Sequence, residues 1–546
     1  MRIGLLTDGG SRQWCDRLVR GLPQHEFTLY AQPRGGADDG RRGLRRRDRA
    51  RFASAFRLLA GAICATPDPG AGADAGGRAN AGDRADAGPG HGRAFAGGLY
   101  ALAELAQEQG GLSAALRSED ALRALEAGCR APGAHRAVQG AGAADLADAA
   151  AALERALRPL SLDWYESLGA ADVVHAAAGG TAALPGLVAK RFCGVPLLVT
   201  EYGVQLRAHC LEQSGTRAVR ALTGGFQARL AAELYDRADL LTPGNAHVRR
   251  WQERCGAPRV RVRTVYPGME ADRFAGVGEA ELAGADPVTL VWVGRVEPAK
   301  DLIGLLHAFA EVRRAEPAAR LRIFCTNPTA TTATTAPTAT AAPTAVAAQS
   351  APSAPADSRY LADCRALAAQ LFPDEAADRV SAGENPVSFE EVGGPYAPSV
   401  AEAYATGRVA VSSSAVEGFP TTLVEAMFCG RATVSTDAGA VFEVIGGTGL
   451  VVPTRNPRAL AEACVSLLRD RERAALLGAA ARARALELFA AERTVEAFGE
   501  MYVDLIAAAG GSTGRTGRWE VPFAVPAEAR VPGHWTTPSR VAEAPV

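Results

Sequence analysis

The sequence predicts an α/β fold made of two doubly wound domains. Short apolar strand patterns alternate with helical patterns in the first half of the chain, and the alternation starts again at Val288. Such alternation is typical of a parallel sheet covered by helices on both faces. A chain of 546 residues is also too long for one hydrophobic core, so two main domains are expected.

The first domain is predicted over residues 1–275. It opens with a buried strand at residues 1–7, followed by the turn Asp8-Gly9-Gly10 into a helix. Further strands are expected at 171–176, 195–200 and 239–242, and helices within 99–157 and at 182–192. Low-complexity insertions are expected near residues 33–92, because 33–48 is rich in Gly and Arg and 67–92 in Gly, Ala and Asp.

The second domain is predicted over residues 287–485, after a hinge at 272–286. Strands are expected at 288–293, 321–325, 409–413, 432–435 and 450–452, with helices at 302–315, from 360, at 422–429 and at 457–469. Residues 326–356 are almost entirely Thr, Ala and Pro, which predicts a disordered insertion. A helix at 486–509 is expected to pack back towards the first domain, and 510–546 to be a disordered tail.

Net charge, cysteine spacing and the length of apolar runs limit the partners and the cellular location that can be expected. The formal net charge of -1 gives no basic excess, so nucleic acid is not expected as a partner, and the basic cluster at residues 41–51 is interpreted as a solvated helix face or loop. The ten cysteines form no C-x-x-C pair and no zinc-type spacing, which favours a reducing cytoplasm. No signal-peptide pattern and no run of about 18 apolar residues occurs, so no transmembrane segment is expected; peripheral membrane association stays open.

One candidate loop joins the strand ending at Gly294 to the following helix. Arg295 stands where the chain leaves the strand, and Lys300 stands just before the helix. Both cations are expected to converge on one anion at the helix N-terminus, and a diphosphate suits this pair. The alternative is two solvated loop cations.

A second candidate loop follows the strand that ends near Ser413. Gly418 lets the backbone approach a ligand closely, and Pro420, Thr421 and Thr422 are suited to opening a helix. The free N–H groups at that helix start predict a second anion site.

Two carboxylates flank the start of this helix. Glu417 precedes it and Glu425 lies about one turn inside, so both are expected to face a cleft and accept hydrogen bonds from sugar and ribose hydroxyls. The alternative is that Glu417 caps the helix and Glu425 is a surface charge.

These loops resemble glycosyltransferase family 4. The hallmark of that family, a Glu, seven residues and a second Glu, is matched by Glu417 and Glu425 within SSAVEGFPTTLVEAM, after GRVEPAKDL. A P-G-x-x-x-x-x-F turn at 267–274 and T-D-A-G-A at 436–440 follow the family's order, so the resemblance covers 265 to about 468. It implies the GT-B fold, two Rossmann-like domains facing across a cleft.

The resemblance also implies an activity. It is retaining transfer of a hexose from a nucleoside diphosphate sugar, UDP-sugar by default, to a hydroxyl acceptor in polysaccharide or glycoconjugate synthesis. The implied catalytic residues are Arg295, Lys300 and Glu417. The implied donor-binding residues are Gly294, Gly418, Phe419, Pro420, Thr421, Thr422 and Glu425. The chain has no D-x-D pair, so no obligatory metal and no cofactor beyond the nucleotide-sugar co-substrate are expected.

The N-terminal half resembles the branch that includes the Pel exopolysaccharide glycosyltransferases, through DVVHAAAGGTAALPGLVAKRFCGVPLLVTEYGVQLR. This chain departs from the branch at two places: the glycine-rich first loop is reduced to residues 8–11, and Tyr202 replaces a His often placed near the reacting sugar. Gly9, Gly10, Glu201 and Tyr202 are predicted on the acceptor side.

Three alternatives stay open. One is a catalytically weak, glycosyltransferase-like subunit that binds nucleotide and assembles with a polysaccharide-export complex. Another is a nicotinamide-dependent oxidoreductase, although GLLTDGGSRQW lacks the G-x-G-x-x-G pattern. A nucleotide-sugar epimerase of the same two-domain shape would act without an acceptor.

Overall fold

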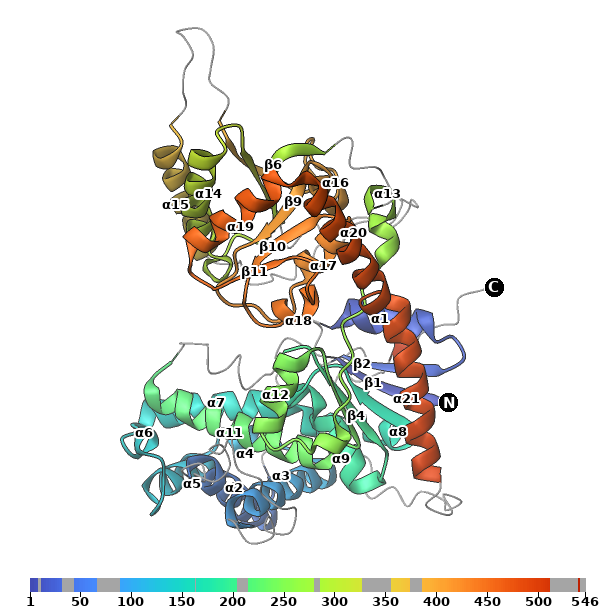
Figure 1. The fold of residues 1–546 in the computed structure, drawn as a ribbon. Coiled ribbons are helices and arrows are strands. Elements are labelled where there is room, and N and C mark those ends of the chain that lie inside the picture. Colours follow the sequence, from blue (N-terminus) through green and yellow to red (C-terminus); the bar gives the residue numbers. More distant parts are fainter. Residues whose placement is uncertain are drawn as a thin grey trace, which may run out of the picture. The chain divides into compact units, whose positions relative to one another are not determined.

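The computed structural model describes residues 1–7, 11–31, 44–65, 89–162, 164–203, 215–278, 285–326, 355–373, 385–510 and 539–540. The chain divides into two compact units: Met1–Tyr266 with Thr494–Val546, and Pro267–Arg493. Each unit contains a six-stranded sheet with helices on its faces (Figure 1). This confirms the predicted fold class, α/β with two Rossmann-like domains.

The first unit is built on a sheet of order β12-β2-β1-β3-β4-β5. Its strands are β1 (Arg2–Thr7), β2 (Glu26–Ala31), β3 (Val173–Ala176), β4 (Leu197–Glu201), β5 (Leu240–Pro243) and β12 (Ser539–Arg540). All neighbours are parallel except β12 and β2. The chain changes direction of travel across the sheet between β1 and β3, which makes that position a topological switch point.

Helices cover both faces of this sheet. They are α1 (Arg12–Gly21), α2 (Arg46–Cys64), α3 (Pro89–Gln109), α4 (Leu112–Leu116), α5 (Glu119–Arg130), α6 (Arg136–Gln139), α7 (Ala143–Leu157), α8 (Tyr165–Gly169), α9 (Leu184–Cys193), α11 (Arg217–Arg237), α12 (Ala246–Arg254) and α21 (Ala491–Gly510). Apolar residues of α1 and α21 pack on one face, and the larger helical cluster that includes α2, α3, α7 and α11 packs on the other.

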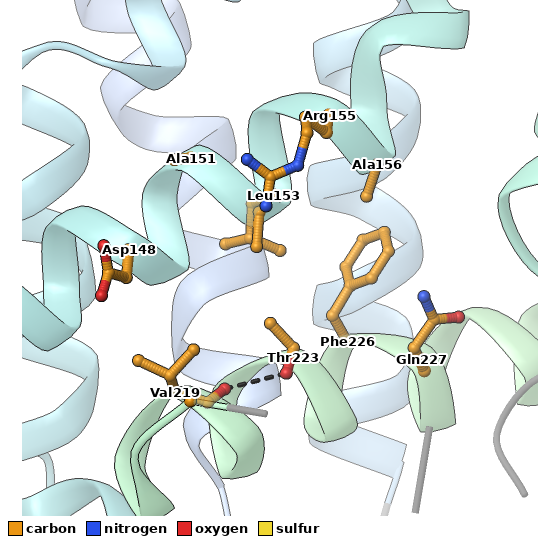
Figure 2. Close-up of a pocket in the computed structure, with 11 residues that line it drawn as sticks. Asp148, Ala151, Leu153, Arg155, Ala156, Val219, Thr223, Phe226 and Gln227 are labelled. Atoms are coloured by element: carbon orange, nitrogen blue, oxygen red, sulfur yellow. Dashed lines mark hydrogen bonds between the residues drawn. The ribbon is translucent and has the colours of Figure 1, made fainter. Parts of the chain in front are cut away.

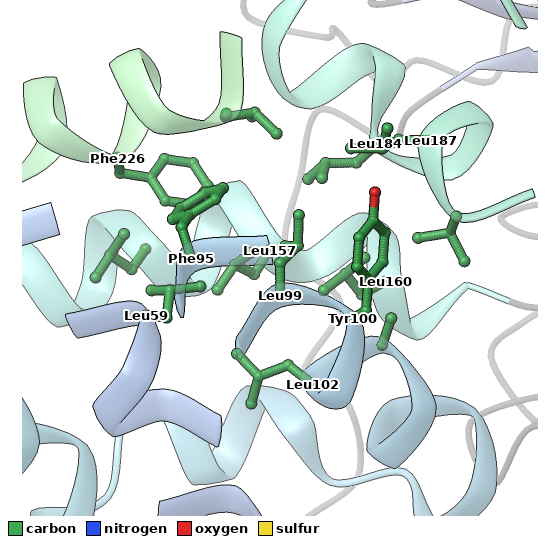
Figure 3. Close-up of a cluster of buried hydrophobic side chains, with 14 of the residues drawn as sticks. Leu59, Phe95, Leu99, Tyr100, Leu102, Leu157, Leu160, Leu184, Leu187 and Phe226 are labelled. Carbon is green, nitrogen blue, oxygen red and sulfur yellow. The ribbon is translucent and has the colours of Figure 1, made fainter. Parts of the chain in front are cut away.

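Between the insertions predicted near residues 33–92 lies a helix that was not predicted, α2 (Arg46–Cys64). Phe52, Phe56 and Leu59 of α2 recur at helical spacing and are fully buried, so this stretch is a core helix. Figure 3 shows Leu59 packed with Phe95 and Phe226. Residues 32–43 and 66–88, which carry most of the Gly-rich sequence, lie outside the described residues.

The predicted disordered tail also needs a correction at two residues. Ser539 and Arg540 form β12, which pairs antiparallel with Leu29 and Thr28 of β2. Their backbone groups therefore complete the edge of the sheet. Residues 511–538 and 541–546 lie outside the described residues, and so does 327–354 of the other low-complexity segment; α15 begins at Pro355.

The second unit has a parallel sheet of order β11-β10-β9-β6-β7-β8. Its strands are β6 (Asp286–Gly294), β7 (Arg320–Cys325), β8 (Val387–Glu391), β9 (Gly407–Ser412), β10 (Ala432–Thr436) and β11 (Leu450–Val452). The chain runs outwards from β6 to β8, returns to the centre at β9 and runs outwards the other way. The switch point therefore lies between β6 and β9.

Helices cover both faces of the second sheet as well. They are α13 (Ala275–Gly278), α14 (Leu302–Ala315), α15 (Pro355–Leu371), α16 (Val400–Ala405), α17 (Thr421–Phe428), α18 (Val441–Ile445), α19 (Pro457–Arg469) and α20 (Arg471–Leu488). One core joins the sheet to α14, α15 and α19. Helices α16, α17 and α20 lie towards the other face (Figure 1).

The unit boundary lies before the predicted hinge. The chain passes from the first unit to the second after Tyr266, not after the predicted residue 275. The residues that follow pack within the second unit, since Phe274 stacks on Phe428 with ring centroids 5.8 Å apart. The second crossing follows Arg493. Residues of α21, among them Phe498 and Tyr502, then belong to the core of the first unit.

Candidate functional site

The two predicted loops lie at the switch point of the second sheet. β6 ends at Gly294 and its neighbour β9 ends at Ser412, so the chain leaves both strands at the same edge. In open parallel sheets, ligands bind outside the carboxyl ends of the strands at this position. The fold thus brings the two loops together from distant parts of the sequence.

The loop after β6 positions Lys300 as the sequence predicts. A short 3-10 helix, Pro298–Lys300, is followed by Asp301, whose φ of 47° lies in the left-handed region. The Asp301 side chain accepts a hydrogen bond from the Gly304 backbone N–H at 3.1 Å and so caps α14. Lys300 therefore stands directly before a capped helix.

Lys300 and Glu417 are in direct contact. Lys300 Nζ donates to Glu417 Oε2 at 2.5 Å, and the two side chains are only 16% and 13% exposed. Ser414 Oγ donates to the same carboxylate oxygen at 3.1 Å, and the Gly418 backbone N–H donates to the other at 3.2 Å. The alternative in which Glu417 caps the helix is therefore not observed: its carboxylate holds a cation.

Backbone contacts fix the two loops to each other. Ser413 Oγ donates to the Lys300 carbonyl at 2.7 Å, and the Ala415 N–H donates to the Ala299 carbonyl at 2.8 Å. Thr436 Oγ1 at the end of β10 donates to the Ser414 carbonyl at 2.7 Å. The site is thus preorganised by hydrogen bonds that do not involve a ligand.

The start of α17 is open to a ligand. Its N-cap is Pro420, no side chain caps it, Thr421 is exposed and Thr422 is half-buried. The Thr421 and Leu423 N–H groups donate to the carbonyls of Phe419 and Pro420, which leaves the Thr422 N–H and the helix dipole to face an anion. Next to it, a methyl group built on Gly418 would meet no atom within 4 Å, so the space in front of this residue is free.

Glu425 lies in the second turn of α17. The side chain is half-buried, and burial raises its pKa to about 7, although the nearby Arg273 guanidinium acts in the opposite direction. Arg273 belongs to the P-G-x-x-x-x-x-F turn, and sequence reasoning gave it no role. Its place directly before Phe274 in that turn was the signal that could have identified it.

Two further predicted residues flank the site. Arg295 is 65% exposed and its nearest carboxylate is Glu297, with Nη2 and Oε2 3.7 Å apart, so its guanidinium is held only loosely. The ring of Phe419 packs edge-on against Phe489, with centroids 5.7 Å apart. Phe419 is thus anchored by its side chain and could offer only its backbone to a ligand.

Of the residues predicted on the acceptor side, the structure describes Glu201 and Tyr202. Gly9 and Gly10 lie outside the described residues. Glu201 is 2% exposed at the end of β4, where its Oε2 accepts hydrogen bonds from Tyr235 Oη and Gln252 Nε2, both at 2.7 Å. Burial raises its pKa. These contacts hold Glu201 inside the first unit, and its acceptor role stays a prediction.

Tyr202 belongs to a buried aromatic cluster. Its ring packs edge-on against Trp14 at 5.8 Å, and Trp14 packs in the same way on His175 at 5.5 Å. His175 Nδ1 and Nε2 lie 2.7 Å from Tyr502 Oη and Thr200 Oγ1. Burial lowers the pKa of His175 to about 3. Sequence reasoning missed this network because Tyr502 is 327 positions away along the chain.

A separate hollow of about 440 Å³ lies between α7 and α11 (Figure 2). Asp148, Arg155, Thr223 and Gln227 line it, together with Leu153 and Phe226 among others. It contains none of the predicted site residues.

Parts of the chain match family models. Residues 373–470 match the model described as "Glycosyl transferases group 1", which covers the loop from Ser412 to Glu425. The second half of the chain resembles group 1 glycosyltransferases. Residues 97–260 match a domain of unknown function, DUF3492.

Two of three curated relatives are named as glycosyltransferases or mannosyltransferases, and the third as a glucosaminyl malate synthase. A D-inositol 3-phosphate glycosyltransferase of Kineococcus radiotolerans is 30% identical over 255 residues, which is 45% of this chain and 52% of the relative. N-acetyl-alpha-D-glucosaminyl L-malate synthase of Bacillus anthracis is 32% identical over 20% of this chain and 29% of the relative. The lipopolysaccharide core mannosyltransferase LpsB of Rhizobium meliloti is 35% identical over 16% of this chain and 27% of the relative. The chain thus spans about half the length of these relatives or less.

Solved structures with similar folds are more distant. Anabaena HepE in complex with UDP and glucose has 17% identity and a TM-score of 0.46 over 63% of this chain and 82% of that one. Sucrose-phosphate synthase of Thermosynechococcus elongatus has 18% identity and a TM-score of 0.46 over 64% of this chain and 79% of that one.

Membrane-spanning helices and metal-binding clusters are both absent from the described residues. None of the helices there is long and apolar enough to span a bilayer. No group of three or more His, Cys, Asp and Glu side chains in the same ranges is arranged to hold a metal ion.

Proposed function

We propose that this protein is a retaining glycosyltransferase that moves a hexose from a nucleoside diphosphate sugar, UDP-sugar by default, to a hydroxyl acceptor. The observation that carries the proposal is the Lys300–Glu417 contact beside the uncapped start of α17, at the switch point of the second sheet. A largely shielded lysine beside the positive end of a helix, where the Thr422 N–H is left over by the turn, suits a dianionic diphosphate.

The proposed chemistry is stabilisation of a leaving group. As the bond between the anomeric carbon and the diphosphate oxygen breaks, negative charge develops on the diphosphate. Lys300, Arg295 and the N–H groups at the start of α17 would neutralise that charge, and one preorganised donor of this kind is worth about 3 kcal/mol of barrier. Lys300 has three N–H donors and gives one to Glu417, so two remain for phosphate oxygens.

The two carboxylates take separate roles in this proposal. Glu417, fixed by Lys300 and Ser414, would contact the donor sugar through its remaining lone pairs. Glu425, deeper in α17, would accept hydrogen bonds from the ribose hydroxyls, as acidic residues do in dinucleotide sites. The backbone N–H of Phe419 would complete the contacts to sugar or phosphate, and that of Gly418 would join it by exchanging its bond to Glu417 Oε1 for one to the ligand.

The acceptor and the setting are also proposals. The names of the relatives refer to inositol phosphate, malate and lipopolysaccharide core, so they select no acceptor class for this chain. We infer synthesis of a polysaccharide or glycoconjugate in the cytoplasm, in line with the resemblance to the Pel branch. The described cysteines are free thiols, which suits a reducing compartment.

The proposal is tested by incubating the full chain with a panel of nucleotide sugars and measuring release of the nucleoside diphosphate, with and without hydroxyl acceptors. Release with UDP-sugar, and an α-linked product from an α-linked donor, are the expected results. If every donor stayed intact while UDP still bound, the protein would instead be the catalytically weak subunit, to which the replacement of a family His by Tyr202 points. Activity lost with chelator and restored by manganese would contradict the expectation of no obligatory metal.

A further inference from the structure

Two arginines occupy neighbouring positions where strands β9 and β10 of the second sheet begin. Arg408 is the second residue of β9, and Arg431 directly precedes β10. Val409 pairs with Ala432 in the parallel ladder, so Arg408 and Arg431 occupy neighbouring positions one step earlier. This is the opposite edge of the sheet from Gly294 and Ser412, where the proposed donor site lies.

Two of the three guanidinium nitrogens of Arg431 are buried without a hydrogen-bond partner in the described structure. Its side chain is 4% exposed, and its Nε and Nη1 make no hydrogen bond in the described structure. The Nε of the half-buried Arg408 and the buried Oγ1 of Thr433, two residues further along β10, are also without partners there. Buried polar groups in folded proteins are almost always hydrogen-bonded, and a buried unpaired charge is far more costly than a neutral group.

The surrounding charge does not compensate these cations. Burial lowers the pKa of Arg431, and the positive charge of Arg408 lowers it further. Cys429 is the one group that acts in the opposite direction, and no carboxylate is among the charged groups that act on Arg431 in the described residues. An anion would supply the partner that these two adjacent cations and their unpartnered N–H donors lack.

We propose that Arg408 and Arg431 bind a phosphate group at this edge of the sheet, as a site separate from the donor site. Guanidinium groups bind phosphate oxygens through paired N–H donors, and a phosphate carries enough oxygens to accept from two of them. Thr433 adds a hydroxyl donor two residues along the same strand. The ligand is free phosphate or the phosphate ester of a small metabolite, because both present the same oxygens.

The test measures phosphate binding to the full chain by calorimetry and thermal unfolding, in a chloride buffer of constant ionic strength. Inorganic phosphate is expected to raise the Tm of the wild type. Arg431→Met and Arg408→Met are each expected to weaken phosphate binding by about tenfold or more, since each removes charge-assisted hydrogen bonds. Arg458→Met is the matched control: its side chain is 86% exposed and paired with Glu462, so binding should be unchanged.

Two comparisons separate this site from the donor site. Arg431→Met should retain the affinity of the wild type for UDP, and Arg295→Ala should retain the response to inorganic phosphate. Glucose 6-phosphate serves as the second probe: tighter binding than inorganic phosphate assigns the site to a phosphate ester, and binding of inorganic phosphate alone assigns it to the free ion.

The unliganded variant gives a second readout. Without phosphate, Arg431→Met is expected to be as stable as the wild type or more stable, because replacing a buried charge that has no partner by an apolar side chain is neutral or stabilising. A clear loss of Tm in phosphate-free buffer would mean that Arg431 is paired within the chain, and would overturn the proposal. So would phosphate binding that is absent in the wild type or unchanged in both variants. If Arg431→Met did not fold, the half-buried Arg408 would decide the question alone.

Discussion

Lys300 and Glu417 are 117 positions apart in the sequence and form an ion pair with Nζ and Oε2 2.5 Å apart. The pair joins the loop after β6 to the loop after β9, at the centre of the second sheet. Both side chains are largely shielded from water, so the cation is held in one place rather than sampling many rotamers.

Replacing Lys300 by Ala should remove most of the transfer activity. The change deletes the cation that is proposed to face the leaving diphosphate and leaves Glu417 without its partner, so kcat should fall by about 10²- to 10³-fold, as for other preorganised charge donors. The measurement is steady-state release of UDP from the preferred donor. A variant with unchanged kcat would show that Lys300 only binds Glu417.

Replacing Arg295 by Ala should affect binding without affecting stability. The side chain is 65% exposed and 3.7 Å from its nearest carboxylate, so its removal should change the free energy of unfolding by less than about 0.5 kcal/mol. The affinity for UDP, measured by calorimetry, should nevertheless fall. Arg458→Ala, which removes another exposed ion-paired arginine, serves as the control and should bind UDP like the wild type.

Two glycines of the site should respond oppositely to substitution by Ala. Gly439 has a φ of 61°, and a methyl group there would lie 2.3 Å from the Glu417 carbonyl oxygen, so Gly439→Ala should lower the free energy of unfolding by about 1 kcal/mol or more. Gly418→Ala meets no protein atom within 4 Å and should keep the Tm of the wild type while weakening UDP-sugar binding. Equal Tm values for the two variants would contradict this arrangement.

The pKa of Glu425 predicts a pH dependence of donor binding. Burial raises this pKa from 4.5 to about 7, so the carboxylate becomes protonated as the pH falls below about 7 and would accept fewer of the hydrogen bonds proposed from ribose. UDP affinity should therefore fall between pH 8 and about 6 in the wild type. Glu425→Gln should bind UDP more weakly and should lack this component of the profile; the ionisation of UDP itself is common to both proteins.

The contribution of Glu425 to the free energy of unfolding should increase as the pH falls over the same range, while the affinity for UDP decreases. Because the folded protein holds the Glu425 proton more tightly than the unfolded chain, this group contributes stability that is complete below pH 4.5 and is lost as the pH rises through about 7. Urea unfolding of the wild type and of Glu425→Gln at several pH values measures the difference. A difference that did not vary with pH would contradict the shift.

Tyr502→Phe should destabilise the first unit. The Tyr502 hydroxyl lies 2.7 Å from Nδ1 of the buried His175, and losing one buried hydrogen bond costs about 1 kcal/mol, or more if His175 is left without a partner. The neighbouring Val503 is 53% exposed, so Val503→Ala is a control expected to unfold like the wild type. Denaturant unfolding monitored by fluorescence gives both values.

Much of the second unit could be predicted from its sequence. The helix over 302–315 and the strand over 450–452 have the predicted bounds, because amphipathic periodicity and the surrounding turn residues determine them locally. The two site loops could also be predicted from the sequence, since glycine, proline and acidic residues stand at fixed positions after a strand. Chemistry carried by a short continuous segment leaves a pattern that one sequence is enough to show.

The remaining features depend on contacts between distant residues. Nothing local to Glu417 says that its partner is Lys300, or that Glu201 is enclosed by Tyr235 and Gln252 in the interior of the first unit. The helix α2 was missed because its arginine-rich start and flanking Gly-rich segments hide the apolar residues, among them Phe52, that bury it in a core.

Titration of UDP into the wild type and into a protein carrying both Arg295→Ala and Lys300→Ala tests the central claim most directly. Calorimetry should show one UDP per wild-type chain and a loss of affinity of about 100-fold or more in the double variant, since both cations proposed to bind the diphosphate are gone. Equal affinity in the two proteins, with the double variant folded, would place the nucleotide elsewhere and contradict the assignment of this site.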